Sequence, residues 1–451
     1  LGSEYRYSSL KTGDPNSQQI CEAGLQGAWE SFQDSKNGFF PFEERRNCLK
    51  QLGLEIEKQK ENLVRILAHD IAKPVDLARA EVERCLNTIR LTLELDPFSD
   101  REFSSSSHSA VTKLQARGPL VAVTPYNFPF NLAMHKIAPA ILAGIPVIWK
   151  PSPHAVLSSL TLMDQFHQAK IPAGFLQFLP MDNEMCLETL KDQRVAHWSF
   201  TGSSKVGWNL RSQVSGKPCT LELGGFAPVY VDHTANLELA AQKIAASAFS
   251  YAGQVCISTQ NVFCHKEVFS EFRSQIESAA EKFSVGRVDV QGVFSSGVIS
   301  EARKHDLVGI KKELSQESAD TWEYPAAIND MRNFIAPTIF YQPSKDSLVF
   351  KEELFAPFMS VNKVDSWREF LDQASSQSHR LQASVFSEDL DSCLNFNADQ
   401  LPYGAILLNE APSLRIDQLP YGGEGLSGLG REGPAYAYRS YHFSQNVVRP
   451  V

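Results

Sequence analysis

The stretch that decides the fold reads GPLVAVTPYNFPFNLAMHKIAPAILAGIPVIWK, residues 118 to 150. It begins with a short apolar run, 120–124, crosses a proline-containing turn, continues as an apolar stretch of helical length, 131–143, and ends in a second short run, 146–149. Short apolar runs on either side of a helix are typical of two parallel strands joined by a crossover helix. The stretch therefore predicts a parallel sheet covered by helices.

The same alternation continues outward from this stretch. We expect further strands at 175–179, 195–200, 220–223 and 228–231, and further helices at 156–169, 184–190 and 205–214. From about residue 235 the pattern repeats more loosely and predicts a second α/β domain. On the N-terminal side, apolar residues at helical spacing predict a helix over 42–68, and Pro74 separates it from a second amphipathic helix. Sheets of this kind bind nucleotides at the carboxyl ends of their strands.

Composition excludes several classes of protein. The chain has 451 residues, which predicts two or three domains, and a net charge of −9, which argues against a nucleic-acid partner. No apolar run reaches the ~18 residues that span a bilayer. The N-terminal residues have no apolar signal core, so we expect a cytoplasmic protein with no membrane partner. The eight cysteines include no Cys-x-x-Cys pair, so we expect neither a disulfide framework nor a metal site.

Several short motifs hold the side chains that could carry chemistry. Taken singly, each has an ordinary interpretation, because a lone cysteine is usually a small apolar side chain and a glycine pair usually marks a turn. So many of them, in this order along one chain, are hard to obtain by chance. The motifs are Pro125-Tyr126-Asn127-Phe128-Pro129-Phe130, Phe200-Thr201-Gly202-Ser203, Leu221-Glu222-Leu223-Gly224-Gly225, Gly253-Gln254-Val255-Cys256, Glu352-Glu353-Leu354-Phe355, and Pro420-Tyr421-Gly422-Gly423 with Ser427-Gly428-Leu429-Gly430-Arg431-Glu432-Gly433.

Together and in this order, the motifs resemble those of the aldehyde dehydrogenase superfamily, from about residue 15 to the end of the chain. The segment Arg415-Ile416-Asp417 is most similar to the branch that includes lactaldehyde, phosphonoacetaldehyde and non-phosphorylating glyceraldehyde-3-phosphate dehydrogenases. The resemblance implies an α/β fold of two Rossmann-like domains and a small β oligomerisation arm, in a dimer or tetramer. It assigns 1–101 and 118–224 to a cofactor-binding domain, 225–432 to a catalytic domain, and 102–117 and 433–451 to the arm.

The resemblance also implies a mechanism. Cys256 matches the nucleophile that attacks the aldehyde, a task that suits a thiolate because it can later leave from a thioester. The side-chain amide of Asn127 and the backbone N–H of Cys256 match the donors that stabilise the resulting oxyanion. Glu222 matches the base that activates water for hydrolysis of the thioester, which favours a free carboxylic acid as the product.

NAD or NADP is the cofactor that the resemblance implies, although no Gly-x-Gly-x-x-Gly fingerprint is present. Lys150 matches a lysine that contacts the cofactor in the family. Many NAD-preferring members have a glutamate three residues after this lysine, where this chain has Pro153. A carboxylate there would repel a 2′-phosphate, so we expect NADP to be tolerated, with preference for either cofactor left open. The residues that match cofactor contacts are Lys150, Ser203, Gly202, Thr201, Glu353, Phe355 and Tyr126.

Polar side chains are expected to line the substrate tunnel. Arg415 is suited to a carboxylate or a phosphate because its fork donates two parallel hydrogen bonds, which predicts a small polar or anionic aldehyde. The competing interpretation is that Arg415 binds Asp417 and never meets the substrate. The positions that match the family's tunnel are Phe128, Asn131, Leu132, His135, Ser250, Arg415 and Tyr421.

Three departures from the family pattern leave the catalytic groups intact: Phe226, Ala356 and Gly425 replace more usual residues. Two alternative functions remain open at this point. A thiol hydrolase or esterase would use Cys256 without a redox cofactor and needs a histidine in contact with it. A non-catalytic binding or structural relative would share the fold, although the fold itself needs none of Asn127, Glu222 and Cys256.

Overall fold

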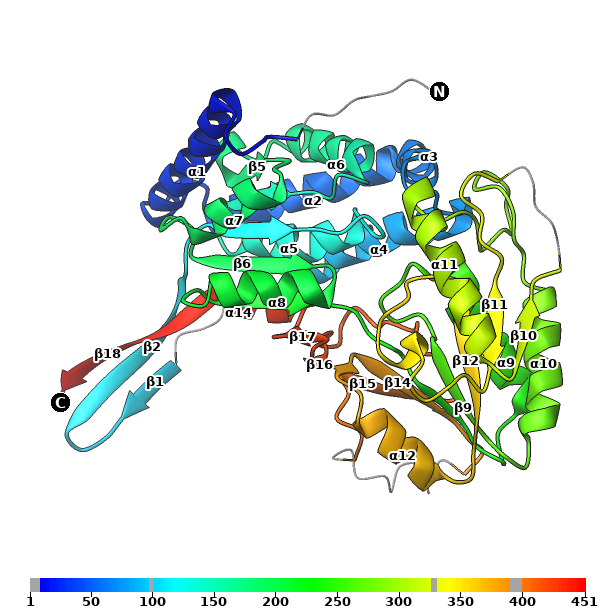
Figure 1. Cartoon of the computed structure of the whole chain (residues 1–451). Helices are drawn as coiled ribbons and strands as arrows, with labels where there is room; N and C mark the ends of the chain where they lie inside the picture. The colour runs from blue at the N-terminus through cyan, green and yellow to red at the C-terminus, as the bar shows by residue number, and fades with distance from the viewer. Residues whose placement is uncertain (1–8, 97–100, 326–330, 390–399) are drawn as a thin grey trace.

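The computed structural model describes residues 9–96, 101–325, 331–389 and 400–451. Figure 1 shows two sheets side by side, each packed against its own helices, and a narrow β ribbon that extends away from the first of them. The predicted α/β fold is therefore confirmed, with two sheets and a small β arm.

Within the described residues, the first sheet has six strands in the spatial order β17 (Gly428–Leu429), β7 (Cys219–Glu222), β6 (His197–Thr201), β3 (Leu120–Val123), β4 (Val147–Lys150) and β5 (Leu176–Phe178). The strands from β7 to β5 run parallel, and β17 lies antiparallel to β7. The chain goes outward from β3 to β4 and β5 and then returns to the other side of β3. The strand order thus reverses between β3 and β6, which is where open α/β sheets bind ligands.

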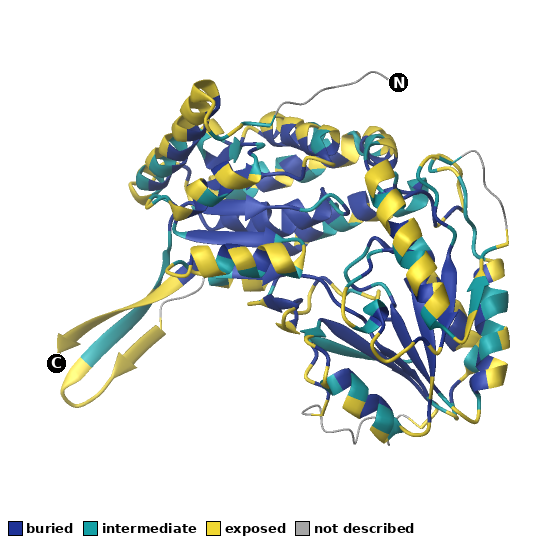
Figure 2. Cartoon of the chain, in the orientation of Figure 1, coloured by how far each residue is buried: buried dark blue, intermediate teal, exposed yellow. Residues whose placement is uncertain are grey.

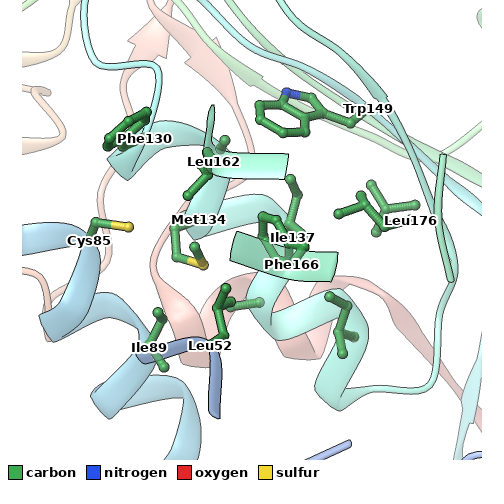
Figure 3. Close-up of a cluster of buried hydrophobic side chains, with 14 of the residues drawn as sticks. Leu52, Cys85, Ile89, Phe130, Met134, Ile137, Trp149, Leu162, Phe166 and Leu176 are labelled. Carbon is green, nitrogen blue, oxygen red and sulfur yellow. The ribbon is translucent and has the colours of Figure 1, made fainter. Parts of the chain in front are cut away.

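Helices cover both faces of the first sheet (Figure 1). One face packs against α2 (Phe42–Lys58), α3 (Lys60–Asp70), α4 (Val75–Leu93), α5 (Asn131–Leu142), α6 (Val156–Gln168) and α14 (Pro434–Ser440). The other face packs against α1 (Pro15–Lys36), α7 (Asn183–Lys191) and α8 (Ser204–Gln213). In Figure 3, Met134 and Ile137 of the buried helix α5 lie between Trp149 of β4 and the apolar side chains of α2, α4 and α6. This burial anchors the loop that leads into α5.

The second sheet has seven strands among the described residues, in the order β10 (Asp320–Glu323), β11 (Thr338–Tyr341), β12 (Phe358–Val364), β9 (Asn261–His265), β8 (Val229–Val231), β14 (Gln382–Phe386) and β15 (Ala405–Leu408). All neighbours run parallel except β10 and β11. The helices of this layer are α9 (Leu237–Phe249), α10 (Phe269–Glu281), α11 (Glu301–Glu317) and α12 (Trp367–Ser375). Shorter elements are η1 (Ala173–Phe175), η2 (Ser250–Gly253), η3 (Leu348–Phe350), β13 (His379–Arg380) and β16 (Glu424–Gly425).

The arm is an antiparallel ribbon of β1 (Arg101–Ser104), β2 (His108–Ala116) and β18 (His442–Pro450). Figure 2 shows that it projects into solvent with exposed or half-buried residues along its length. Phe103 and Val448 face each other across Ala110, and both keep more than half of their surface exposed, at 63% and 59%. A monomer thus presents apolar side chains on a free β ribbon.

One predicted helix is wrong in its extent. The stretch 42–68 forms two helices, α2 and α3, which meet at Gln59. The φ of Gln59 is −99° and its ψ is 6°, so the chain turns between them, although no proline or glycine marks the break. Among the helices of the described residues, none combines the length and the apolar character needed to cross a bilayer.

Candidate active site

A cavity of about 700 Å³ opens at the carboxyl end of the first sheet. The loops after β3, β6 and β7 and the end of β4 line one side of it. The turn that contains Cys256, the start of α11 and the segment around Glu353 line the other. All residues predicted as catalytic or cofactor-binding line this cavity: Cys256, Glu222, Asn127, Lys150, Ser203, Gly202, Thr201, Glu353, Phe355 and Tyr126.

Cys256 lies just beyond a sharp turn that follows α9. Tyr251 and Ala252 both have φ 52°, in the left-handed region that side chains other than glycine rarely adopt. Gly253 follows with φ 68°, and a Cβ at this position would lie 1.9 Å from the carbonyl oxygen of Ala356. Only glycine therefore fits, and the strained turn directs the chain into the cavity, as strained backbones at functional sites often do.

The thiol of Cys256 contacts a phenol. Its Sγ lies 3.1 Å from the hydroxyl oxygen of Tyr421. Burial raises the pKa of the thiol to about 12, and the contact with Tyr421 opposes that rise. The thiol is therefore neutral in this state and needs help from its surroundings to become a nucleophile.

Asn127 is held from two directions in the loop between β3 and α5. Its side-chain amide donates a hydrogen bond of 2.9 Å to the carbonyl oxygen of Gln254, two residues before Cys256. Its own carbonyl oxygen accepts a hydrogen bond of 2.6 Å from the ammonium of Lys73. An amide NH₂ group has two N–H donors, so one remains for a ligand beside the thiol.

Lys73 forms a fully buried ion pair with Glu81. The second oxygen of Glu81 accepts hydrogen bonds from the backbone N–H groups of Phe130, at 2.9 Å, and Asn131, at 3.3 Å. These donors lie at the start of α5, whose own sequence provides no side-chain cap. One carboxylate from α4 thus neutralises Lys73 and caps the helix that follows the Asn127 loop.

Glu222 ends β7 inside the cavity, where it is 3% exposed. Neither of its carboxylate oxygens has a hydrogen-bond partner among the residues that the structure describes. Burial first, and the nearby carboxylate of Glu432 second, raise the pKa of Glu222 well above its ordinary value. A carboxylate with a raised pKa and no hydrogen-bond partner is a stronger base than an exposed glutamate and is suited to take up a proton.

Glu432 is the opposite case. It accepts a hydrogen bond of 2.8 Å from Lys136, and the guanidinium of Arg415 lies 3.4 Å from its other oxygen. Burial alone would raise the pKa of Glu432, but the charges of Lys136, His135 and Arg415 hold it at about 2. Glu432 therefore remains charged next to Glu222.

The end of the cavity at β4 and β6 fits a nucleotide pyrophosphate. The ammonium of Lys150, at the end of β4, makes no hydrogen bond or ion pair with any residue in the described parts of the chain. The hydroxyl of Thr201 is buried and has no hydrogen-bond partner among the residues that the structure places. Ser203 caps the N-terminus of α8, where free N–H groups and the helix dipole favour an anion. A cation, an unsatisfied hydroxyl and a helix N-terminus that line one cavity form a suitable site for phosphate groups.

Glu353 and Phe355 lie on the opposite wall. Burial raises the pKa of Glu353 to about 8, and its carboxyl accepts a hydrogen bond of 3.4 Å from the backbone of Gly225. A Cβ at Gly224 would lie 2.1 Å from Glu353, so the glycine lets the carboxyl approach the loop after β7. The ring of Phe355 meets that of Tyr126 edge to face, with centroids 6.2 Å apart.

Arg415 lies at the deep end of the cavity, where its side chain is 7% exposed. Its guanidinium is 3.5 Å from Asp417, which also accepts a hydrogen bond of 2.7 Å from Arg84 of α4. The guanidinium also packs on the ring of Tyr421, 3.9 Å from its centroid. Arg415 thus binds Asp417, as the competing interpretation held, and also lines the cavity.

Two of the predicted tunnel residues lie outside the cavity wall. His135 is fully buried behind Arg415, 3.3 Å from its guanidinium, and burial lowers the pKa of His135 to about 4. Ser250 begins the short helix η2 and does not line the cavity. The other predicted tunnel residues do line it: Phe128, Asn131, Leu132, Arg415 and Tyr421.

Several polar residues of the site escaped the sequence motifs. Arg84, Arg303 and Asp306 line the cavity. They lie on α4 and α11, and no local pattern distinguishes them from solvent-exposed helical residues. Glu432 also lines the cavity and belongs to the motif 427–433, but its role was not predicted, because nothing local shows that it meets Lys136.

Comparison with known proteins places this geometry in a family. The profile of the aldehyde dehydrogenase family matches residues 14–447. A lactaldehyde dehydrogenase of Methanococcus aeolicus is 32% identical over 87% of this chain and 85% of its own length. A 3-sulfolactaldehyde dehydrogenase of Priestia aryabhattai is 31% identical over 89% of this chain and 85% of its own length.

A solved structure shows the same fold. The glyceraldehyde-3-phosphate dehydrogenase of Methanocaldococcus jannaschii, in complex with NADP, superposes with a TM-score of 0.90 at 29% identity. The match covers 96% of this chain and 95% of that one. The match over nearly the whole sequence and the shared fold lead to one conclusion: this chain is an NAD(P)-dependent enzyme of the aldehyde dehydrogenase family.

Proposed function

We propose that this enzyme oxidises a small polar or anionic aldehyde to the carboxylic acid, through a thiohemiacetal and then a thioester on Cys256. The observation that carries the proposal is the convergence, in one cavity, of the Cys256 thiol, the Asn127 amide and the Glu222 carboxylate. A nucleophile, an oxyanion donor and a base are the three groups that this reaction requires.

In the first step, the thiol of Cys256 releases its proton to water in the cavity, the sulfur attacks the aldehyde carbon and the electron pair of the C=O bond moves to the oxygen, which becomes an oxyanion. The free N–H of the Asn127 amide and the backbone N–H of Cys256 donate hydrogen bonds to that oxygen. Each such donor lowers the barrier by about 3 kcal/mol. The hydrogen bond from Asn127 to Gln254 holds the amide beside the turn that carries the thiol.

NAD or NADP, when bound, would supply the acceptor for a hydride. When the former aldehyde carbon loses its hydride, the oxyanion becomes a carbonyl group again and Cys256 carries a thioester. Glu222 then takes a proton from a water molecule, and the oxygen of that water attacks the thioester carbon. The C–S bond breaks, the acid leaves and the sulfur returns to its starting state. The buried, unpartnered carboxylate of Glu222 and its raised pKa support this role as a base.

The residues that we propose to hold the cofactor divide into two groups. Lys150, Gly202 and Ser203, at the ends of β4 and β6, would bind the phosphate and ribose groups, and Thr201, Glu353, Phe355 and Tyr126 would surround the nicotinamide end. Pro153 leaves room for a 2′-phosphate, and the charge of Lys150 favours one. The similar enzyme of Methanocaldococcus jannaschii was solved with NADP, which supports NADP as an acceptable cofactor here.

The wall of the cavity supports a polar substrate. Arg415, Asn131 and Arg84 line the cavity with polar side chains, and an apolar aldehyde packed against them would displace water from these groups without replacing its hydrogen bonds. Two of the similar enzymes bear the names of aldehydes with an anionic group, a sulfonate in one and a phosphate in the other. These observations favour an aldehyde with a hydroxyl, carboxylate, phosphate or sulfonate group.

Two further assignments belong to the proposal. The arm is assigned to contacts with a second copy of the chain, because it presents exposed apolar side chains and free strand edges. Residues 1–101 and 118–224 are assigned to cofactor binding, and 225–432 to catalysis. In this arrangement, β17 of the second segment adds to the first sheet next to Glu222.

Replacement of the nucleophile tests the proposal. Cys256→Ala should abolish NAD(P)H formation from aldehydes and leave cofactor binding and the thermal unfolding midpoint unchanged. Turnover above a few per cent of wild type would refute the role of Cys256. A thiol hydrolase would instead cleave esters with no cofactor, but the contact of the Cys256 sulfur is Tyr421 and not a histidine in the described residues.

A further inference from the structure

The hydroxyl of Tyr421 and the sulfur of Cys256 are 3.1 Å apart, which is within hydrogen-bond distance for a sulfur atom. When the thiol loses its proton, the sulfur has only lone pairs, so the phenol must be the donor in this contact. We propose that the Tyr421 hydroxyl donates a hydrogen bond to the Cys256 thiolate and is a catalytic residue that prepares the nucleophile. The inference rests on the proposed role of Cys256 and adds to it the group that stabilises the reactive form.

Other sources of thiolate stabilisation are weak here. Reactive cysteines usually lie at a helix N-terminus or beside a histidine or lysine. Cys256 lies in a turn that follows η2, and its sulfur makes no contact with a histidine or a lysine of the described chain. Burial works against the charged form, and among the effects that favour the thiolate the contact with Tyr421 is the largest. The hydroxyl is thus the main group available for this task.

The phenol is suited to remain a donor. Burial raises the pKa of Tyr421 well above its ordinary value, so the hydroxyl keeps its proton throughout the working range of pH. The guanidinium of Arg415 lies 3.9 Å from the ring centroid. A cation on the ring face draws electron density from the ring and strengthens the O–H as a donor.

The backbone fixes the position of the hydroxyl. Tyr421 and Glu432 form an isolated bridge, in which the N–H of Tyr421 donates to Glu432 over 3.0 Å and the N–H of Glu432 donates back over 2.6 Å. Lys136 holds the side chain of Glu432, and Arg415 holds the ring of Tyr421. Because the bridge fixes the backbone of Tyr421 and Arg415 packs on its ring, little conformational entropy is lost when the hydroxyl meets the sulfur.

The experiment compares Tyr421→Phe with wild type, without aldehyde or cofactor. The rate at which iodoacetamide alkylates Cys256 is followed by mass spectrometry of the peptide that contains it, from neutral to mildly alkaline pH. In this range the rate reports the thiolate fraction. Loss of the hydrogen bond should raise the apparent pKa by about one unit, so alkylation at a fixed pH slows roughly tenfold. Phenylalanine keeps the ring on Arg415, which preserves the packing.

A second reagent and a matched variant separate this effect from others. N-ethylmaleimide should show the same fold-decrease, since a change in access would affect the two reagents differently. Tyr403→Phe removes a buried hydroxyl that donates 2.9 Å to Ala374 and does not line the cavity, and it should leave alkylation of Cys256 unchanged. An unchanged or faster rate in Tyr421→Phe overturns the inference. Because the assay contains no substrate, that result is distinct from a failure of Cys256→Ala to abolish turnover, which would overturn the proposed function.

Discussion

Lys136 donates a hydrogen bond to Glu432 over 2.8 Å, and this ion pair lies beside Glu222, which has no partner of its own in the described chain. The two carboxylates therefore differ in pKa. Nearby cations hold the pKa of Glu432 at about 2, whereas burial and the charge of Glu432 raise the pKa of Glu222. Such separation assigns one carboxylate to a fixed charge and the other to proton transfer.

Glu222→Gln should separate the two halves of the reaction. We expect a first burst of NAD(P)H close to one equivalent per active site, followed by steady turnover at least roughly a hundredfold slower, because the thioester is no longer hydrolysed. Rapid-mixing absorbance measurements give both quantities. In wild type, Glu222 accepts a proton only when ionised, and its pKa is raised well above the ordinary value, so steady turnover should fall as the pH decreases and should begin to fall at a higher pH than an unshifted glutamate would give. Loss of the burst itself would show that Glu222 acts before hydrolysis.

Arg415→Met should change substrate preference more than it changes overall activity. Loss of a charge-assisted, forked donor should lower the ratio of kcat/KM for anionic over neutral aldehydes by roughly tenfold or more. Arg415→Lys keeps the charge without the fork and should recover only part of the ratio. If the ratio stays constant in Arg415→Met, or if wild type prefers hexanal or benzaldehyde, then Arg415 serves Asp417 and Glu432 alone.

Pro153→Glu should convert the enzyme to a preference for NAD. The new carboxylate would repel a 2′-phosphate held near Lys150, so kcat/KM for NADP should fall by at least roughly tenfold, with little change for NAD. Pro153→Gln, which has the same length and no charge, is the matched control and should change neither value by more than about threefold. Equal losses for both cofactors, or a strong preference of wild type for NAD, would contradict the expectation that NADP is accepted.

Lys73→Met tests the energetics of the ion pair with Glu81. The change leaves a buried carboxylate without its cation and should lower the free energy of unfolding in urea by about 3–5 kcal/mol. Lys73→Met combined with Glu81→Gln should recover part of this loss, because the amide oxygen still caps α5. Lys243→Met breaks a half-exposed pair with Glu410 and should cost about 1 kcal/mol or less. Similar losses from both single variants would show that burial of the pair has no special weight.

The arm predicts a homodimer or a dimer of dimers. Light scattering of wild type at micromolar concentration should give a mass of two or four chains. Val448→Asp places a charge on the exposed apolar face of β18 and should shift the mass towards one chain. Val308→Asp changes an equally exposed valine on α11, away from the arm, and should leave the mass unaltered. A monomeric wild type would refute the assignment of the arm.

The parallel strands and the crossover helices could be predicted from the sequence because each is recorded in neighbouring residues. The apolar runs at 120–124 and 146–149 became β3 and β4 with ends shifted by about one residue. The break between α2 and α3 could not be predicted from the sequence, because Gln59 has no strong backbone preference and the turn depends on packing.

In the site, too, the residues within local motifs could be predicted from the sequence and the contacts between distant residues could not. Asn127, Glu222 and Cys256 lie in motifs with recognisable neighbours, and the structure brings them into one cavity. The bond between Lys73 and Asn127, the cap from Glu81 to Phe130 and the meeting of Lys136 with Glu432 join residues far apart in sequence. The position of His135 matches a tunnel residue of the family, but in the structure its side chain is fully buried against Arg415 and does not line the cavity.

The placement of β17 beside β7 has a consequence for the order in which the enzyme matures. A chain that is still being synthesised exposes Cys256 long before the residues 415–432 exist, and the N-terminal parts of a chain fold first. The Tyr421 contact, the Arg415 guanidinium and the charge of Glu432 reach the nucleophile only when this late segment returns to the first sheet. A chain that stops before this segment therefore has a Cys256 thiol without its phenol partner, and the contact that we propose to prepare the nucleophile belongs to the finished enzyme alone.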